Sequence, residues 1–407
     1  MPDTSVAADL DSPFRFEYEP ATLRYAPDAV QSLGAELDAQ GYNSALVVCG
    51  ATVGDTPAVM DPVREGLGDR LAGTFAETTP AKRLGTACDG LERLREVDAD
   101  CLVAVGGGSS LDVAKIISIL AATDRDPAAV GQAFVDSGTI AVPEAELPPI
   151  IAAPTTLAGA DLSLVAGVTA APDTCPVNEP ASGGVSDPKL MPEAVCYDPD
   201  LIATTPRPIL AASAMNGFDK GIETLYAASA TPVTDATASR GLGLLTDGLL
   251  AFGTGDDDPW VYQSLTQGLM LVQYGISRAD GTTLSLIHAL GHGLTRAYEV
   301  QQGAAHAVIA PHALSYLFEQ VDGRRSLLAD ALGAGDASDP TAAVIDQIND
   351  VVTALGLPTR LRDVDGPGRE AFPEVADAVL EDAFIANAPS ELAPTRKDIV
   401  SVLESAW

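Results

Sequence analysis

A glycine-rich stretch between an apolar run and a helix-forming run is the feature that most constrains how this chain folds. Residues 105–115 read VGGGSSLDVAK and follow the apolar residues 101–104. Such a run is typical of a strand buried in a parallel sheet. Ser109 or Ser110 is expected to cap the following helix, whose N-terminal dipole favours an anion. We therefore predict a pyrophosphate cradle made by the amides of Gly106, Gly107 and Gly108, the alternative being a plain strand-to-helix turn.

The length and texture of the chain predict two domains. Single hydrophobic cores tend to split beyond about 250 to 300 residues, and this chain has 407. Strand-like and helix-like segments alternate in the first half, which predicts βαβ units and a parallel sheet, whereas 3.6-residue apolar spacing predicts helices in the second half. We expect an α/β, Rossmann-like dinucleotide-binding domain over 1–205 and an all-α domain over 206–407.

The predicted strands cover 45–49, 101–105 and 149–153, with edge strands at 14–18 and 164–169. The predicted helices of the first half cover 81–97 and 111–122, and 171–192 is predicted to be a loop. The predicted helices of the second half cover 209–228, 234–250, 260–278 and 284–297.

The charge of the chain excludes several classes of partner. Acidic residues outnumber basic ones by 57 to 23, for a net charge of −34, so nucleic acid and anionic membranes would repel it. The carboxylates are scattered between apolar runs, as in cytoplasmic proteins of extreme halophiles, and their repulsion is tolerable where salt screens it. The five cysteines lack CxxC spacing and are interpreted as free thiols. With no leader and no run of 18 apolar residues, we predict a soluble, cytoplasmic protein.

Several motifs occur in the order typical of one known group of proteins. They are ALVVCG at 45–50, GGGSSLDVAK at 106–115, PTT at 154–156, YDP at 197–199, HALGH at 288–292 and AHAV at 305–308. Over nearly the whole chain these resemble the iron-type alcohol dehydrogenases, a superfamily that includes glycerol dehydrogenases, maleylacetate reductases and, more distantly, dehydroquinate synthases. PTTLAGADLS at 154–163 and GAAHAVIAPH at 303–312 are similar to the maleylacetate reductase branch.

The resemblance implies a dehydroquinate synthase-like fold and a coenzyme, NADP or NAD. Relatives often carry an Asp at the position of Gly50, where it would repel the 2′-phosphate of NADP. The absence of this Asp at position 50 predicts that NADPH is accepted. The alternative is that Gly50 merely makes a tight turn. Thr155, Thr156 and Leu157 are expected to cover the adenine or pyrophosphate. Asp112 either contacts the loop or coenzyme or stabilises its helix N-terminus.

The same resemblance implies a metal site that has degenerated. Relatives place Asp and His four residues apart on one helix and complete the site with two further histidines. Here Asn216 and Lys220 take the first two positions, His288 keeps the third and Gln302 takes the fourth. A protonated Lys has no lone pair, and amides are poor ligands for Fe or Zn, so a divalent metal is not expected.

We predict that Lys220 takes over the role of the metal. A divalent ion with one carboxylate and three neutral imidazoles has the same net charge as Lys⁺ with Asn, His and Gln. The ammonium would polarise a substrate carbonyl and stabilise a developing alkoxide. Burial would lower its pKa, whereas Asp219 or Glu223 would oppose that shift. The alternative is an exposed helix lysine in a dead pocket.

Other assignments of the polar residues remain open. A gapped register would give a metal set of Asp219, Glu223, His288 and His306. His292, one turn after His288, matches a position thought to relay protons, and a packed core histidine is the alternative. His306 would point into the same cleft.

The sequence therefore predicts an NAD(P)-dependent alcohol dehydrogenase or carbonyl reductase that acts on a small polar substrate, with Lys220, His288 and His292 as catalytic residues. A maleylacetate-type oxo-acid reductase is the specific alternative. A lyase that resembles dehydroquinate synthase and a non-catalytic nucleotide-binding protein are alternatives of other classes. The resemblance also implies a homodimer or larger homo-oligomer.

Overall fold

A parallel sheet forms the centre of the N-terminal half. The computed structural model describes residues 14–173, 175, 177–298 and 300–407. Six strands pair in parallel in the order β1-β8-β5-β4-β2-β3. Their bounds are β1 Thr22–Tyr25, β2 Ala45–Gly50, β3 Leu71–Thr78, β4 Cys101–Gly106, β5 Ile150–Pro154 and β8 Ala194–Tyr197.

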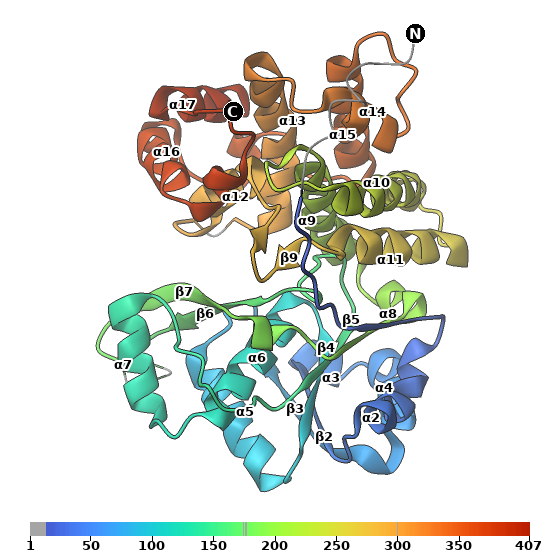
Figure 1. Ribbon diagram of the computed structural model, residues 1–407, viewed down its shortest axis with the longest axis vertical. Helices are drawn as coiled ribbons and strands as arrows, with labels where there is room; N and C mark the ends of the chain where they lie inside the picture. Colours follow the sequence, from blue (N-terminus) through green and yellow to red (C-terminus); the bar gives the residue numbers. More distant parts are fainter. Residues whose placement is uncertain (1–13, 174, 176, 299) are drawn as a thin grey trace.

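Helices cover both faces of this sheet (Figure 1). They are α2 Leu33–Gln40, α3 Ala51–Gly54, α4 Pro57–Leu67, α5 Leu84–Glu96, α6 Gly108–Ala122, α7 Pro127–Ser137 and α8 Pro199–Ala203. The central strands β4 and β5 are buried along their whole length, as expected of strands with helices on both faces. This confirms the predicted α/β fold, and the carboxyl ends of the strands face the helical half.

The C-terminal half is helical apart from a small ribbon. Its helices are α9 Arg207–Tyr226, α10 Pro232–Gly253, α11 Pro259–Gln273, α12 Leu286–Thr295, α13 Gln302–Gln320, α14 Arg325–Ala331, α15 Pro340–Ala354, α16 Phe372–Leu380 and α17 Arg396–Ser405. The ribbon pairs β9 Ser277–Arg278 with β10 Gly281–Thr282. Buried apolar side chains of these helices form one core, separate from the two cores that flank the sheet.

Four local predictions were wrong, among them the helix predicted over 260–278, which ends at Gln273 before strand β9. The segment 14–18 forms no strand, because its aromatic rings dock on the helical half: Tyr18 packs edge-on against Tyr274, at 4.9 Å between ring centroids. Residues 164–169 do not extend the main sheet, since β6 Val165–Ala170 pairs with β7 Ala181–Ser186 in a ribbon of its own. That pairing also places a strand inside the predicted loop 171–192.

Two glycines let helix α9 make close backbone contacts. A Cβ on Gly217 would lie 2.3 Å from the carbonyl oxygen of Leu157, and one on Gly303 would lie 1.8 Å from that of Ala212. Real Cβ atoms do not approach backbone this closely, so only glycine fits at either place. The first contact presses α9 against the segment after β5, and the second seats the start of α13 against α9.

Among the described residues, we find no helix that combines the length and the apolar character needed to cross a bilayer.

Candidate active site

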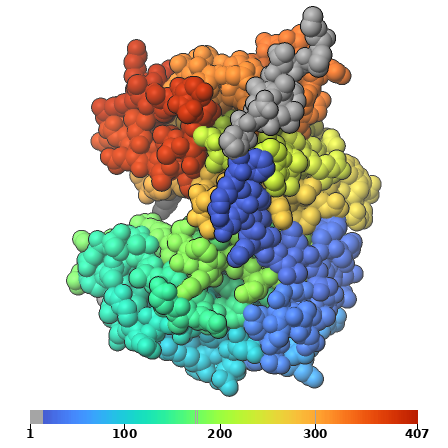
Figure 2. Space-filling model, in the orientation of Figure 1, coloured from blue at the N-terminus to red at the C-terminus, as the bar shows by residue number. Residues whose placement is uncertain are grey.

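A cavity of about 860 Å³ lies between the two halves and collects most of the predicted catalytic residues. Figure 2 shows the α/β half, mostly blue to green, stacked against the helical half, coloured yellow-green to red. The predicted residues that line the cavity are Gly108, Asp112, Asn216, Lys220, His288, His292 and Gln302. Residues more than a hundred positions apart therefore meet around one space.

The glycine-rich loop brings a close-packed backbone and the start of α6 to the carboxyl end of β4. Gly106 ends β4 with φ of +139°, a conformation that L side chains rarely adopt. A Cβ on Gly107 would lie 3.2 Å from the Thr156 side chain, so this backbone is close-packed. Gly107 is the N-cap of α6 and provides no side-chain cap. The first amides of α6 thus depend on another acceptor, which a pyrophosphate would supply.

The two serines of the loop do not cap α6, which corrects the prediction for Ser109 and Ser110. The helix begins at Gly108, one residue before them, so both lie inside its first turn. The hydroxyl of Ser110 instead lies 2.9 Å from that of Thr78, the last residue of β3. This contact fixes the loop against the end of β3, the edge strand of the sheet.

The other predicted coenzyme residues lie near the same edge. Gly50 ends β2, the strand next to β4, and is the N-cap of α3. The amide of Thr155 donates to the carbonyl of Gly106 at 3.0 Å, which fixes the segment after β5 against the loop. Leu157 is wholly buried in the helical core, and its amide donates to the Ser213 hydroxyl at 3.1 Å. Its side chain therefore packs away from the cavity.

Asp112 bonds within the protein. Its carboxylate pairs with the Lys82 ammonium at 2.6 Å and accepts the Gly167 amide at 3.2 Å. Lys82 also lines the cavity and was not singled out in the sequence. The bond from Gly167 links α6 to β6, whereas the ion pair links α6 to the turn before α5 and leaves a lysine whose side chain is 35% exposed.

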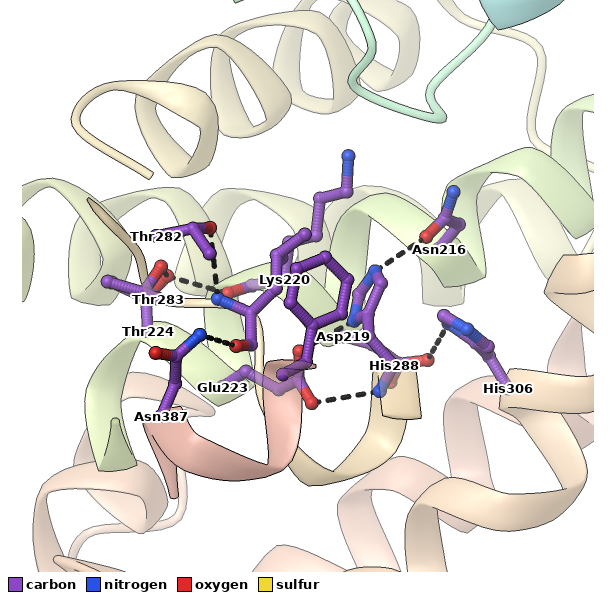
Figure 3. A network of polar contacts seen from close by, with 12 residues as sticks. Asn216, Asp219, Lys220, Glu223, Thr224, Thr282, Thr283, His288, His306 and Asn387 are labelled. Atoms are coloured by element: carbon purple, nitrogen blue, oxygen red, sulfur yellow. Dashed lines mark hydrogen bonds and ion pairs between the residues drawn. The ribbon is translucent and has the colours of Figure 1, made fainter. Parts of the chain in front are cut away.

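Asn216, Lys220, His288 and Gln302 all line the cavity, and Figure 3 shows the first three close together. Asn216 and Lys220 lie four residues apart on α9, so they share one face of the helix. His288 Nε2 lies 3.0 Å from the Asn216 amide oxygen. Two amides, an ammonium and one imidazole are the polar groups at these four positions.

Lys220 is buried rather than exposed. Its side chain is 9% exposed, and Nζ donates to the carbonyl of Gly159 at 2.6 Å. Burial lowers the pKa of Lys220 to about 8, while Asp161, Asp112 and Glu223 oppose the shift. The predicted direction of the shift is confirmed, but Asp161 replaces Asp219 among the opposing carboxylates. A lysine with this pKa can hold a positive charge or release a proton near neutral pH.

A carboxylate that the sequence did not reveal holds His292. Asp382, at the start of a 3₁₀ helix at Ala383–Asn387, accepts from His292 Nδ1 at 2.8 Å and pairs with Arg296 at 2.9 Å. Burial opposes ionisation of Asp382, but the hydrogen bond from His292 and the charge of Arg296 hold its pKa below the ordinary value. The bond directs Nε2 of His292 away from Asp382, on a ring that is 24% exposed and lines the cavity.

The alternative metal set is brought together but is not arranged as a metal site. Glu223 lies 2.6 Å from His288 Nδ1, and Asp219 lies 3.3 Å from His306 Nδ1. His306 is wholly buried behind His288 and faces Gly291 rather than the cleft, which corrects its predicted position. Within the described residues, no three side chains of His, Cys, Asp or Glu are grouped to hold an ion.

Comparisons with known proteins agree with this architecture. The model of the family "Iron-containing alcohol dehydrogenase" matches residues 20–199, and that of the "Fe-containing alcohol dehydrogenase family, C-terminal" matches 210–407. A maleylacetate reductase of Pseudomonas aeruginosa is 27% identical over 97% of each chain. An NAD-dependent methanol dehydrogenase of Bacillus methanolicus is 27% identical over 93% of this chain and 96% of its own. The crystal structure of a putative alcohol dehydrogenase from Ralstonia eutropha superposes with a TM-score of 0.79 at 27% identity, covering 98% of each chain.

Proposed function

The chain belongs to the iron-containing alcohol dehydrogenase family, and we propose that it is an NAD(P)-dependent reductase whose catalytic cation is Lys220 instead of a metal ion. The observation that carries the proposal is the position of this buried ammonium, on the cavity wall beside Asn216, His288 and Gln302. Turnover of NADPH or NADH with a panel of aldehydes, ketones and oxo acids, in chelator-treated protein, tests it.

The residues present do not fit the metal that the family name implies. A protonated Lys has three donors and no lone pair, and the Asn and Gln amides are weak donors to Fe or Zn. His288 is the one strong ligand among the four, and its ring already contacts Glu223 and Asn216. The coenzyme does fit, because the close-packed glycines and the uncapped start of α6 offer amides to a pyrophosphate.

The coenzyme, Lys220 and His292 each take a separate role in carbonyl reduction. A bound reduced nicotinamide supplies the hydride when a carbonyl is reduced. The Lys220 ammonium, close to where the carbonyl oxygen would lie, stabilises the negative charge that develops there and can pass its Nζ proton to that oxygen. His292, oriented by Asp382 and partly open to solvent, replaces the proton from water.

The charge of the cavity favours an oxo acid as the specific alternative substrate. Among the described residues that line it, Lys82, Lys220 and Arg296 stand against one carboxylate, that of Asp112, in a chain that is otherwise strongly acidic. A maleylacetate reductase is among the relatives reported above. A kcat/KM for maleylacetate above that for uncharged aldehydes and ketones would select this alternative, and the reverse order would remove it.

The coenzyme prediction concerns Gly50. We expect wild-type protein to accept NADPH, and we expect Gly50→Asp to lower kcat/KM for NADPH relative to NADH by about 10- to 100-fold, because a carboxylate would face the 2′-phosphate. Steady-state kinetics with both coenzymes measures this. Gly50→Ala is the matched control, since it adds the same Cβ near the Thr78 carbonyl without a charge. An equal loss of kcat/KM for NADPH in both variants would show that the added Cβ, and not the charge, causes the effect.

The pH dependence of reduction follows from Lys220. The protonated amine is the active form, so log kcat for carbonyl reduction should be flat below the pKa of about 8 and should decline above it. The alcohol oxidation rate should change in the opposite sense. Lys220→Arg keeps its charge across this range, so its residual activity should lack the alkaline decline. A wild-type profile without this decline would contradict the assignment.

We also propose that the acidic composition adapts the protein to a salt-rich cytoplasm. With a net charge of −34, screening at about 1 M salt or above should relieve repulsion between carboxylates. We expect Tm to rise by several degrees when KCl replaces a dilute buffer. Sucrose, which does not screen charge, is the control, and an equal rise in sucrose would refute the electrostatic explanation.

A further inference from the structure

Glu223 is a buried carboxylate that is not among the residues lining the cavity and has no role in the function proposed above. It lies on α9, one turn after Lys220, and is fully buried (Figure 3). Its Oε2 lies 2.6 Å from His288 Nδ1, while Oε1 accepts the His288 amide at 3.0 Å and the Tyr226 hydroxyl at 3.2 Å. It therefore contacts both the ring and the backbone of one catalytic residue.

The same carboxylate caps helix α12 from outside. The N-cap residue of α12, Ser285, makes no side-chain capping bond. The amides of His288, Ser285 and Ile287 stabilise the charge of Glu223 instead, and the N-terminal dipole of α12 adds to this effect. Glu223 thus fixes the helix that carries both His288 and His292 relative to Lys220 on α9.

The bond to Nδ1 determines what the other ring nitrogen can do. Burial lowers the pKa of His288 well below its ordinary value, so the ring is neutral and carries one proton. An ionised Glu223 accepts that proton's hydrogen bond at Nδ1, which leaves a lone pair on Nε2. Rotation of the Asn216 amide lets its Nδ2 donate to this lone pair, and a substrate hydroxyl can take the place of that donor.

We propose that Glu223 is a positioning residue that holds His288 as the Nδ1–H tautomer, so that Nε2 accepts the hydroxyl hydrogen of an alcohol whose oxygen lies near Lys220. Nε2 only accepts this hydrogen bond and orients the alcohol oxygen toward Lys220, while the hydroxyl proton itself passes to Lys220 Nζ in oxidation and returns from it in reduction. His292 has a parallel arrangement, with Asp382 on its Nδ1.

The test compares Glu223→Gln with Tyr226→Phe. Gln keeps an oxygen for the amides of α12 but places an N–H against Nδ1, which forces the proton of His288 onto Nε2. We expect kcat to fall about 10- to 100-fold, with the KM for coenzyme unchanged. Tyr226→Phe removes a neighbouring hydroxyl that contacts the same carboxylate but keeps the contact of Glu223 with Nδ1, so the Nδ1–H tautomer should persist in this variant.

The spectroscopic readout does not depend on turnover. In ¹⁵N-histidine-labelled full-length protein, at a pH above the Glu223 pKa of about 7, two-bond correlations distinguish the Nδ1–H tautomer from the Nε2–H tautomer. The His288 signal is the one missing in His288→Asn. We expect Nδ1–H in the wild type and Nε2–H in Glu223→Gln. Nε2–H in the wild type would overturn the proposal, as would an unchanged kcat in Glu223→Gln. The proposal rests on the proposed reductase function, but inactivity of wild-type protein on every carbonyl would refute that function alone, because the tautomer is read without a substrate.

Discussion

Replacing Lys220 by Met should lower kcat for carbonyl reduction by about 10²- to 10³-fold, the usual cost of losing one donor that stabilises a developing oxyanion. Met keeps most of the volume of the lysine stem but removes the ammonium. The coenzyme KM should change little, because the pyrophosphate cradle lies on α6 and Lys220 lies on α9. Steady-state kinetics of the purified variant measures both quantities.

Lys220→Met is expected to fold as stably as the wild type, so a loss of kcat can be assigned to the mechanism. Lys220 is buried with a depressed pKa, so a neutral side chain avoids the cost of desolvating a charge, and the free energy of unfolding should not fall. Lys397→Met, at an exposed position on α17, removes an equal charge far from the cavity and should leave kcat unchanged. Equal kcat values for wild type and Lys220→Met would remove Lys220 from the mechanism.

Restoring the ligand types of metal-dependent relatives should create a metal site. The triple variant Asn216→Asp, Lys220→His and Gln302→His, together with the native His288, places one carboxylate and three imidazoles in the lining of the same cavity. These donors suit Zn²⁺ or Fe²⁺. We expect it to bind about one divalent ion per chain and to have an activity that chelators abolish.

The single variant Lys220→His is the matched control for this gain. It leaves two imidazoles beside two amides, which is too few strong donors for a stoichiometric ion. Elemental analysis after dialysis against Zn²⁺ or Fe²⁺ measures both proteins. Failure of the triple variant to hold an ion would show that the four side chains do not surround a common point.

The parts of the fold that the sequence predicted are those with a strong local pattern. The strands β2, β4 and β5 are continuous apolar runs because helices bury both of their faces. By contrast, β3 is half-buried along most of its length and has no clear alternation, so it was missed. The segment 14–18 has aromatic residues at alternate positions, but tertiary packing on Tyr274 decides its conformation.

In the site, too, residues close together in the sequence were predicted more readily than contacts between distant residues. Asn216 and Lys220 share a helix face, and His288 and His292 are one turn apart, so spacing placed the members of each pair together, while the resemblance to the family placed the two pairs in one site. Arg296, one further turn along, could have been found in the same way. Asp382 could not, because it lies 90 residues from the histidine that it orients. Glu223 was assigned as a possible ligand, and only the packing of α9 against α12 showed that it contacts His288.

The central claim is that a lysine ammonium performs the electrostatic role that a metal ion performs elsewhere in this family. The most direct test measures, on one sample of wild-type enzyme, the metal content and kcat before and after exhaustive treatment with a chelator. The account predicts full activity with less than about one-tenth of a divalent ion per chain. A stoichiometric ion whose removal abolishes turnover, and whose return restores it, would contradict the account.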